Sequence, residues 1–213
     1  MKKIAIIDPF MVSPSIHCFN HLVTQLPAQL TYHQPHRLGF ETLNTHNHDG
    51  FIVLGSASNV TDNEAWHKEL SDYLVNQLEH KKSVLGICFG HQLMAKAFEA
   101  EVNYIQPDQE KLKGTRVVTF LEDFGPIQKG VELKFALTHQ QMVKALSPQL
   151  IEVARGLPHD IIRHKTLPFT GIQPHPEGSA HFCQNNALIE HSSSIEKVQT
   201  DGLFFVKAWL GSF

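Results

Sequence analysis

The sequence predicts an α/β fold, with an open and mostly parallel sheet covered by helices on both faces. Continuous apolar runs at residues 4–8, 51–54 and 83–87 lack alternating polar positions, which is typical of strands buried on both faces of a parallel sheet. Segments with apolar residues at helical spacing lie between these runs. This alternation of strands and helices is what parallel crossover connections require.

Strands and amphipathic helices alternate through the first half of the chain. In order, we expect a strand at 4–8, a helix at 15–26, a short strand at 30–33, a polar stretch of weak helical character at 35–48, a strand at 51–54, a helix from 61 or 62 to about 78, and a strand at 83–87 that leads into a helix at 93–98. Thr61 or Asp62 is expected to cap the helix that follows it, because short polar side chains accept hydrogen bonds from free helix N–H groups.

The second half is expected to be rich in antiparallel strands. Short apolar runs occur there between turns marked by Gly and Pro, at 101–105, 115–120, 131–137, 151–154, 161–164 and 169–173. A polar segment starts at Ser179, and a closing amphipathic helix is expected over 201–210. No linker composition interrupts the chain, so residues 1–213 are expected to form a single domain.

Composition excludes several classes of function. The formal net charge is -3, so no basic surface for nucleic acid or anionic membrane is expected, and no apolar run is long enough to span a bilayer. The three cysteines are widely separated, which favours a reducing, cytoplasmic setting over a disulfide framework. His17 and His21 share a helix face, but no third ligand accompanies them, so no metal site is predicted.

The stretch around Cys88 has a pattern typical of a nucleophile. Cys88 falls where the strand at 83–87 passes into a helix, beside an N-terminus whose partial positive charge favours a thiolate. Gly86 and Gly90 flank it, as a sharp strand-to-helix turn requires, and are expected to leave room for a substrate carbonyl. The alternative is a small core residue, the commonest fate of a free cysteine.

A histidine between two prolines follows the strand expected at 169–173. The prolines restrict the backbone on both sides of His175, which suits a group whose direction matters. The imidazole can accept a proton from a thiol, and Glu177 can hold its other nitrogen. With Cys88, these residues would form a nucleophile, a base and an orienting carboxylate. The alternative for the His-Pro-Glu segment is a surface turn.

Together, the stretches Gly86-Ile-Cys-Phe-Gly-His-Gln92 and Gly171-Ile-Gln-Pro-His-Pro-Glu177 resemble the class I, or triad, glutamine amidotransferases, including the glutaminase portion of GMP synthase. The resemblance covers essentially the whole chain. It implies a flavodoxin-like or Rossmann-like three-layer sandwich, with a central mostly parallel sheet and a β-rich antiparallel extension. Neither a cofactor nor a metal is expected.

The resemblance also implies roles for individual residues. Cys88 would attack the side-chain amide carbon of glutamine, His175 would carry the proton to the leaving ammonia, and Glu177 would orient His175. Water would then hydrolyse a γ-glutamyl thioester to glutamate. The implied oxyanion hole consists of the backbone N–H groups of Ser56 and Phe89. The residues implied to bind substrate are Gly55, Gln92, Thr138, His139 and Gln140.

The chain departs from the family pattern in the segment expected to form the oxyanion hole. Gly55-Ser56-Ala57 stands where the family commonly has Gly-Gly-Pro. A side chain at Ser56 restricts the backbone, so the hole is expected to form differently or only on activation. Gln141 stands where an acidic residue is common among the GMP synthase relatives, and Pro174 replaces a frequent aromatic residue.

Three functions remain open from the sequence. The first is hydrolysis of glutamine, either alone or feeding ammonia to a separate synthase. No Gly-x-x-x-x-Gly-Lys-Ser/Thr loop for ATP is present, so activation of an ammonia acceptor is expected either to come from elsewhere or not to exist. The second is stand-alone hydrolysis of γ-glutamyl compounds through the same thioester. The third is a catalytically inactive relative that binds a partner or a metabolite.

Overall fold

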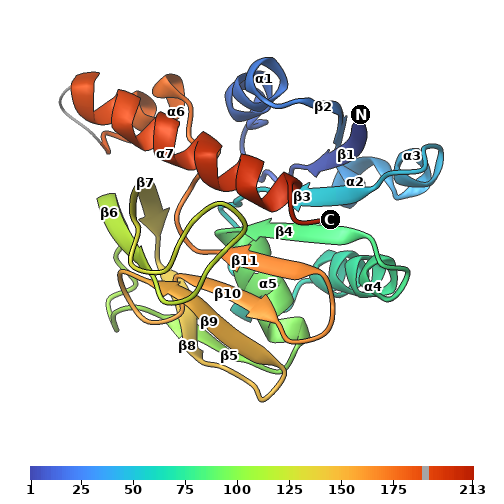
Figure 1. Cartoon of the computed structure of the whole chain (residues 1–213). Helices are drawn as coiled ribbons and strands as arrows, with labels where there is room; N and C mark the ends of the chain where they lie inside the picture. Colours follow the sequence, from blue (N-terminus) through green and yellow to red (C-terminus); the bar gives the residue numbers. More distant parts are fainter. Residues whose placement is uncertain (189–191) are drawn as a thin grey trace.

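The computed structural model describes residues 1–188 and 192–213 and has an α/β architecture (Figure 1). Its strands are β1 Lys2–Ile7, β2 Ala28–His33, β3 Gly50–Val53, β4 Ser83–Ile87, β5 Glu101–Tyr104, β6 Leu112–Phe120, β7 Glu132–His139, β8 Gln141–Ala145, β9 Leu150–Arg155, β10 Ile161–His164 and β11 Phe169–Ile172. Its helices are α1 Ile16–Gln25, α2 Pro35–Leu38, α3 Glu41–Asn44, the 3-10 turn η1 Val60–Asp62, α4 Ala65–Glu79, α5 Phe89–Ala97, α6 Ala180–Asn185 and α7 Ser192–Leu210.

The large sheet is parallel in one part and antiparallel in the other. Its nine strands run in the order β2-β1-β3-β4-β11-β10-β9-β6-β7, and β5 pairs with β8 in a separate small sheet. The first five strands in this order are parallel to one another. The last four continue the sheet as antiparallel strands. The predicted central parallel sheet with an antiparallel extension is therefore confirmed.

Strand β11 is an exception to the predicted antiparallel second half. It inserts in parallel beside β4, with Ile172 opposite Ile87. The backbone N–H of Cys88 continues this pairing by donating to the carbonyl of Ile172 at 2.8 Å. Because the carboxyl ends of parallel strands meet at one edge, the segments that follow β4 and β11 begin side by side.

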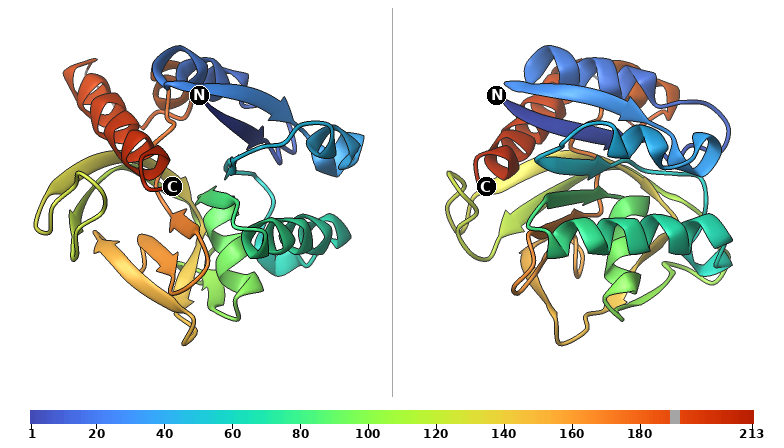
Figure 2. Two further views of the ribbon diagram at one scale, coloured as in Figure 1. Left: turned by 45° about the vertical axis from the view of Figure 1, so that its right-hand side comes forward. Right: turned by 90° about the vertical axis from the view of Figure 1, so that its right-hand side faces the viewer.

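Helices cover both faces of the parallel strands (Figures 1 and 2). On one face, Ile6 of β1 belongs to an apolar core that includes Trp209 of α7, while on the other face Ile7 packs in a second core with Leu74 of α4. Side chains alternate along a strand, so burial of both faces explains the continuous apolar runs of the sequence.

The start of α4 differs from the prediction. Thr61 and Asp62 lie in the 3-10 turn η1 and do not cap the helix, which begins at Ala65 after Glu64. Asn63 separates the two elements with a φ of 52°. Asn tolerates this left-handed conformation better than most residues, so the chain changes direction there before the helix begins.

Other element boundaries also differ from the prediction. Helix α5 begins directly after Cys88, and α7 is longer than the segment expected at 201–210. The sequence does not predict β8, whose partner β5 lies far from it along the chain. The polar segment expected from Ser179 contains α6, capped by the Ser179 hydroxyl; its residues 189–191 lie outside the described part.

The described residues contain neither a membrane-spanning helix nor a metal-binding cluster. No helix among them is long and apolar enough to cross a membrane. Residues 1–188 and 192–213 contain no group of three His, Cys, Asp or Glu side chains placed to hold a metal ion. The ring of His17 instead lies against that of His181, with 3.6 Å between the ring centroids. Cys18, Cys88 and Cys183 are free thiols and are all buried.

Buried neutral histidines make the fold sensitive to acid. Burial lowers the pKa of His91 to about 3 and that of His139 to about 4, whereas both titrate near 6.5 when unfolded. Below about pH 6.5 the unfolded chain therefore binds protons that the folded chain does not. The free energy of unfolding therefore decreases as the pH falls below about 6.5, by up to about 1.4 kcal/mol per pH unit for each histidine.

Urea unfolding at about pH 7.5 and about pH 5.5 measures this loss through the free energy of unfolding. The wild-type chain should be less stable at the lower pH, and His139→Gln should reduce the difference. Equal free energies of unfolding at the two pH values in the wild type would contradict this expectation.

Candidate active site

Cys88 lies at a strained turn between β4 and α5. Its φ is 51° and its ψ is -100°, a conformation that costs a non-glycine residue about 1 to 3 kcal/mol and persists only where the surroundings enforce it. A Cβ on Gly86 would lie 2.5 Å from the Gly90 carbonyl oxygen, and one on Gly90 would lie 2.6 Å from the Val53 carbonyl oxygen. The two glycines therefore allow the helix to approach the strands closely.

The close contact of α5 with the strands, and not access for a substrate, explains why glycine occurs at positions 86 and 90. They were expected to clear the approach of a substrate carbonyl, but the atoms that exclude a side chain at Gly86 and Gly90 belong to the protein's own backbone. The turn at Cys88 depends on this packing, because the helix can begin directly after the strand only when its first turn touches the sheet.

The thiol of Cys88 faces a cavity at the carboxyl edge of the parallel strands. The cavity has a volume of about 220 Å³, and Gly55, Thr138, His175 and Glu177 contribute to its wall with Cys88. Cys88 is 5% exposed, and its Sγ lies 3.9 Å from the carbonyl oxygen of Thr138. A small substrate in this cavity would reach the sulfur with most of the surrounding water excluded.

His175 reaches the same cavity from the segment after β11. Its backbone N–H donates to the carbonyl of Ala136 in β7 at 2.8 Å, which fixes the position of the loop. Its Nδ1 donates to Oε1 of Glu177 at 2.9 Å, and both side chains are almost fully buried. With Nδ1 engaged in this way, Nε2 is the nitrogen that remains to exchange a proton with a substrate or a thiol.

The charges around His175 favour its protonated form. Burial alone would lower the pKa of His175, but the negative charge of Glu177 and the interaction with Cys88 outweigh burial and hold the pKa well above 6.5. An imidazole in this setting is stabilised as an imidazolium. The arrangement therefore suits transfer of the thiol proton to His175.

The predicted oxyanion loop is fixed by the side chain of Ser56. Its Oγ donates to the carbonyl of Pro9 at 2.5 Å and accepts from the N–H of Ser58 at 3.1 Å. Ser56 does not have a positive φ, so the loop adopts a conformation open to a residue with a side chain. Within the described chain, the N–H groups of Ser56 and Phe89 donate no hydrogen bond to another residue.

Gly55 lies directly against the histidine. A Cβ at this position would lie 2.8 Å from Cε1 of His175 and 3.5 Å from Cβ of Cys88. Any side chain at position 55 would therefore displace the imidazole of His175. This close approach explains the glycine, whose backbone angles are not unusual.

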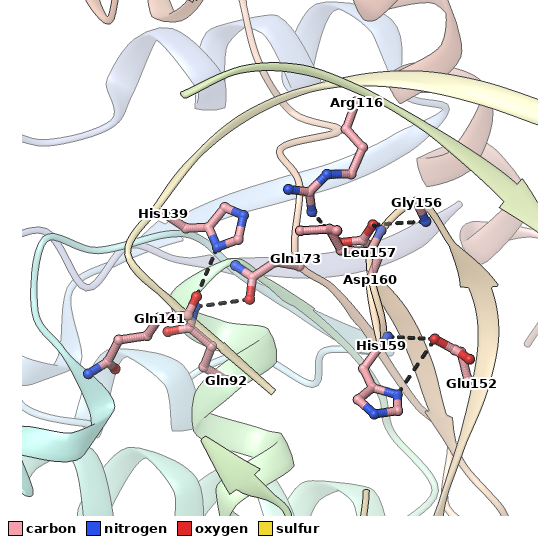
Figure 3. Close-up of polar contacts among 10 residues, drawn as sticks. All are labelled: Gln92, Arg116, His139, Gln141, Glu152, Gly156, Leu157, His159, Asp160 and Gln173. Atoms are coloured by element: carbon pink, nitrogen blue, oxygen red, sulfur yellow. Dashed lines mark hydrogen bonds and ion pairs between the residues drawn. The ribbon is translucent and has the colours of Figure 1, made fainter. Parts of the chain in front are cut away.

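The structure divides the residues predicted to bind substrate into two groups. Gly55 and Thr138 line the cavity, whereas Gln92, His139 and Gln140 do not. The side chains of the second group bond to protein atoms, and Figure 3 shows Gln92 and His139 in a buried polar cluster. The substrate contacts predicted for the backbone of His139 and Gln140, and for the side chain of Gln92, remain untested.

Sequence reasoning missed the outer wall of the cavity. It is formed by the loop after β1 and by residues from other parts of the chain: Phe10, Met11, Val12, Ser13, Ser15, Cys18, Lys111, Phe182 and Asn186. Asp8, buried at the end of β1, pins this loop by accepting from the N–H of Ser15 at 2.6 Å and from the hydroxyl of Tyr32. An acid directly before a proline at the end of a buried strand was the available signal for an ordered loop.

Helix α7 supports the histidine loop from behind. A Cβ on Gly202 would clash with the carbonyl group of Pro176, the residue between His175 and Glu177. In the same region, the carboxylate of Asp201 accepts from the N–H of Lys134 in β7 at 2.7 Å. The segment that carries His175 and Glu177 therefore lies between β7 and α7, with glycine required at the closest contact.

This contact predicts the effect of a small substitution far from the cavity. Gly202→Ala should displace Pro176 and with it the His175–Glu177 pair. The kcat for glutamine hydrolysis, the reaction that the family resemblance implies, should then fall by about tenfold or more. Ala is the better helix former, so the isolated helix should not be weakened. Steady-state kinetics of the purified variant measure the effect, and wild-type kcat in a folded Gly202→Ala protein would show that the contact is unimportant for activity.

The family of the chain follows from comparison with known proteins. The family model described as glutamine amidotransferase class-I matches residues 13–191, so the chain belongs to this family. A glutamine-hydrolyzing GMP synthase subunit of Pyrococcus furiosus is 37% identical over 108 residues, which cover 47% of this chain and 55% of the relative. Gamma-glutamyl peptidase 4 of Arabidopsis thaliana is 26% identical over 179 residues, which cover 75% of this chain and 71% of the relative.

A solved structure gives the same fold. A glutamine amidotransferase from Thermotoga maritima aligns with a TM-score of 0.70 and 14% identity, covering 99% of this chain and 97% of that chain. At this identity the similarity shows the fold alone. The match to the Pyrococcus furiosus relative spans about half of that protein's length. The predicted family and fold class are confirmed.

Proposed function

We propose that the chain is a cysteine-dependent amidohydrolase that converts glutamine to glutamate and ammonia through a thioester on Cys88. The observation that carries the proposal is the meeting of three side chains at one cavity. Cys88 lies there at an enforced left-handed turn, and Nδ1 of His175 lies 2.9 Å from Oε1 of Glu177. This is the arrangement of a nucleophile, a base and an orienting carboxylate.

The proposed reaction has two halves. His175 takes the thiol proton through Nε2 while Sγ of Cys88 attacks the amide carbon of glutamine, and a tetrahedral oxyanion forms. Collapse of this intermediate breaks the C–N bond, and the leaving ammonia takes the proton from His175. A water molecule then gives a proton to His175 and attacks the thioester carbon. The C–S bond breaks, glutamate leaves, and the proton returns to the sulfur.

Two backbone N–H groups are proposed to stabilise the oxyanion. The N–H of Phe89 belongs to the first turn of α5, where helix N–H groups have no partner within the helix. The N–H of Ser56 lies on the other side of the cavity, in the loop tied to Pro9. Donors held in place before the reaction stabilise the developing charge without reorganisation. Gly55 and Thr138 are the proposed substrate contacts among the residues that line the cavity.

We also propose that the ammonia serves a separate synthase chain in the cytoplasm. The Pyrococcus furiosus relative is named as one subunit of a glutamine-hydrolyzing GMP synthase, and such a name denotes one part of an assembly. The three free, buried cysteines of this chain suit a reducing compartment.

A second candidate substrate is supported by the outer wall of the cavity. Met11 and Val12 lie on this wall and are 38% and 88% exposed, and Phe182 lies there with its ring 4.7 Å from that of His175. Exposed apolar side chains suit contact with an apolar group beyond the scissile amide. The Arabidopsis thaliana relative is named as a gamma-glutamyl peptidase. The same thioester chemistry would then release an amine in place of ammonia.

Glutamate release from glutamine and from a γ-glutamyl amine tests these proposals. The wild-type chain should release glutamate from at least one of them. Cys88→Ala should lose activity by at least about a thousandfold, because the nucleophile is absent. Preference for glutamine supports the first proposal, and preference for the amine supports the second.

A matched control uses a buried cysteine outside the proposed triad. Cys183→Ala should retain most of the activity, since Cys183 lies on α6, packs in a core cluster with Val198 of α7 and Ala136 of β7, and does not line the cavity. A wild-type chain that cleaves neither substrate and forms no alkylated Cys88 with iodoacetamide would refute the enzymatic proposal.

A further inference from the structure

We propose that His67 is a positioning residue, which holds the two backbone segments of the proposed oxyanion hole in place. The inference rests on the proposed function for the role of that hole, but the contacts that carry it lie within the protein. His67 belongs to the first turn of α4 and is 4% exposed. Its imidazole contacts both Ser58, in the loop of Ser56, and the ring of Phe89.

The first contact anchors the loop that contains Ser56. Nε2 of His67 and Oγ of Ser58 form a hydrogen bond of 2.8 Å. The N–H of Ser58 donates to Oγ of Ser56 at 3.1 Å, and the Ser56 hydroxyl donates to the carbonyl of Pro9 at 2.5 Å. Serine side chains that bond to nearby backbone groups in this way stabilise turns. The turn is therefore tied to the loop after β1 through Pro9 and to α4 through His67.

The second contact restrains the side chain of Phe89. The ring centroids of His67 and Phe89 lie 5.2 Å apart, and the ring of Trp66 stacks on that of Phe89 with 5.3 Å between the centroids. Aromatic pairs at such distances contribute about 0.5 to 1.5 kcal/mol each beyond the area that they bury. Phe89 is 1% exposed and is the first residue of α5. A ring held by two neighbours therefore also restrains the backbone N–H of Phe89.

The start of α4 is itself attached to α5. Nζ of Lys96 in α5 donates to the carbonyl of Val60 at 2.8 Å and to Oδ1 of Asn63 at 2.5 Å. Val60 and Asn63 belong to the segment just before α4. The backbone that carries His67 is therefore fixed relative to the helix that begins at Phe89, so His67 can hold the loop of Ser56 at a defined distance from that helix.

The surroundings of His67 allow its hydrogen bond to be removed while a ring is kept. A cavity of about 290 Å³ borders the side chain and is also lined by Val60, Leu93 and Ala97, so a slightly larger ring has room. Burial lowers the pKa of His67, so the imidazole is neutral near pH 7. Replacement by phenylalanine therefore removes the bond to Ser58 without removing a charge, and it keeps a ring against Phe89.

Loss of the bond should affect the steps in which an oxyanion forms. The proposed hole acts when the carbonyl oxygen becomes charged, during formation and hydrolysis of the thioester. Alkylation of Cys88 by iodoacetamide forms no oxyanion, because the sulfur displaces iodide from a saturated carbon. A loosened loop should therefore lower kcat and leave the rate of alkylation unchanged, whereas a disturbed thiol or a partly unfolded protein would change both.

The test compares His67→Phe and Ser58→Ala with the wild type. The readouts are kcat and KM with glutamine, or with a γ-glutamyl amine if that is the substrate cleaved, and the rate constant of Cys88 alkylation by iodoacetamide. We expect each variant to lower kcat by about tenfold or more, to change KM by less than about threefold and to change the alkylation rate by less than about twofold.

Three further variants serve as rescue, coupling test and control. His67→Gln offers an amide nitrogen in place of Nε2 and should retain most of the wild-type kcat. The double variant His67→Phe with Ser58→Ala should be little worse than either single variant, because both remove the same bond. His80→Phe makes the matched substitution at the exposed end of α4 and should have wild-type kinetics.

Three results would overturn the proposal. Wild-type kcat in a folded His67→Phe protein would show that the bond to Ser58 does not matter for the reaction. A parallel fall of kcat and of the alkylation rate in His67→Phe and Ser58→Ala would place the defect at the thiol. A rise in KM at constant kcat would show that His67 affects substrate binding and not the oxyanion.

Hydrogen exchange separates the failure of this proposal from failure of the proposed function. If the wild type cleaves neither substrate, the proposed function is wrong, and exchange of backbone amides decides whether His67 holds the loop. Faster exchange over residues 55–59 in His67→Phe, with unchanged exchange over residues 2–7, supports the proposal, and equal exchange in the two proteins contradicts it. If His67→Phe does not fold, Ser58→Ala, at a half-buried loop position, decides by the same readouts.

Discussion

The candidate active site depends on the close approach of helix α5 to strands β3 and β4. At this contact the backbone of Gly86 touches that of Gly90, and Gly90 touches Val53. No room remains for a connecting loop, so the chain turns at Cys88 in a left-handed conformation that the residue would not adopt alone. Packing of the surrounding core therefore stabilises the strained turn that places the thiol at the edge of the sheet.

The rest of the site is brought to this point by the order of the strands. Because β11 inserts in parallel beside β4, the chain after Ile172 begins next to Cys88. The hydrogen bond from His175 to Ala136 and the contact of Pro176 with Gly202 then hold the histidine loop between β7 and α7. Glu177 supplies the charge that keeps the pKa of His175 high in a buried place. The fold thus provides both the geometry and the electrostatics.

Local patterns in the sequence were sufficient for the parallel strands of the first half of the chain and for the family, but not for the parallel pairing of β11. The apolar runs at 4–8, 51–54 and 83–87 are strands buried on both faces, and the motifs around Cys88 and His175 identify the confirmed class of protein. The structure brings Cys88, His175 and Glu177 together at one cavity, while their catalytic roles remain predictions. The strands and the motifs could be predicted because each depends on residues close together in the chain, whereas the meeting of the three side chains depends on the pairing of β11 with β4.

Features that depend on contacts between distant segments of the chain could not be predicted from the sequence. Strand β8 forms only by pairing with β5, and the outer wall of the cavity joins the loop after β1 to Lys111 and α6. The hydrogen bonds from Gln92 to Gln141 and Gln173 also join distant segments, and no local pattern indicates them. The side chain of Ser56 looked like a restriction on the oxyanion loop, but its bond to Pro9 ties that loop to the rest of the site.

The proposed mechanism requires that Cys88 becomes acylated by the γ-carbonyl of its substrate. Mass spectrometry of the chain quenched in acid during turnover of glutamine, or of a γ-glutamyl amine if that is the substrate cleaved, tests this most directly. We expect a glutamyl thioester on the peptide that contains Cys88, which disappears on treatment with hydroxylamine and is absent in Cys88→Ala. Steady turnover with no acyl group on Cys88, or an acyl group on another residue, would contradict it.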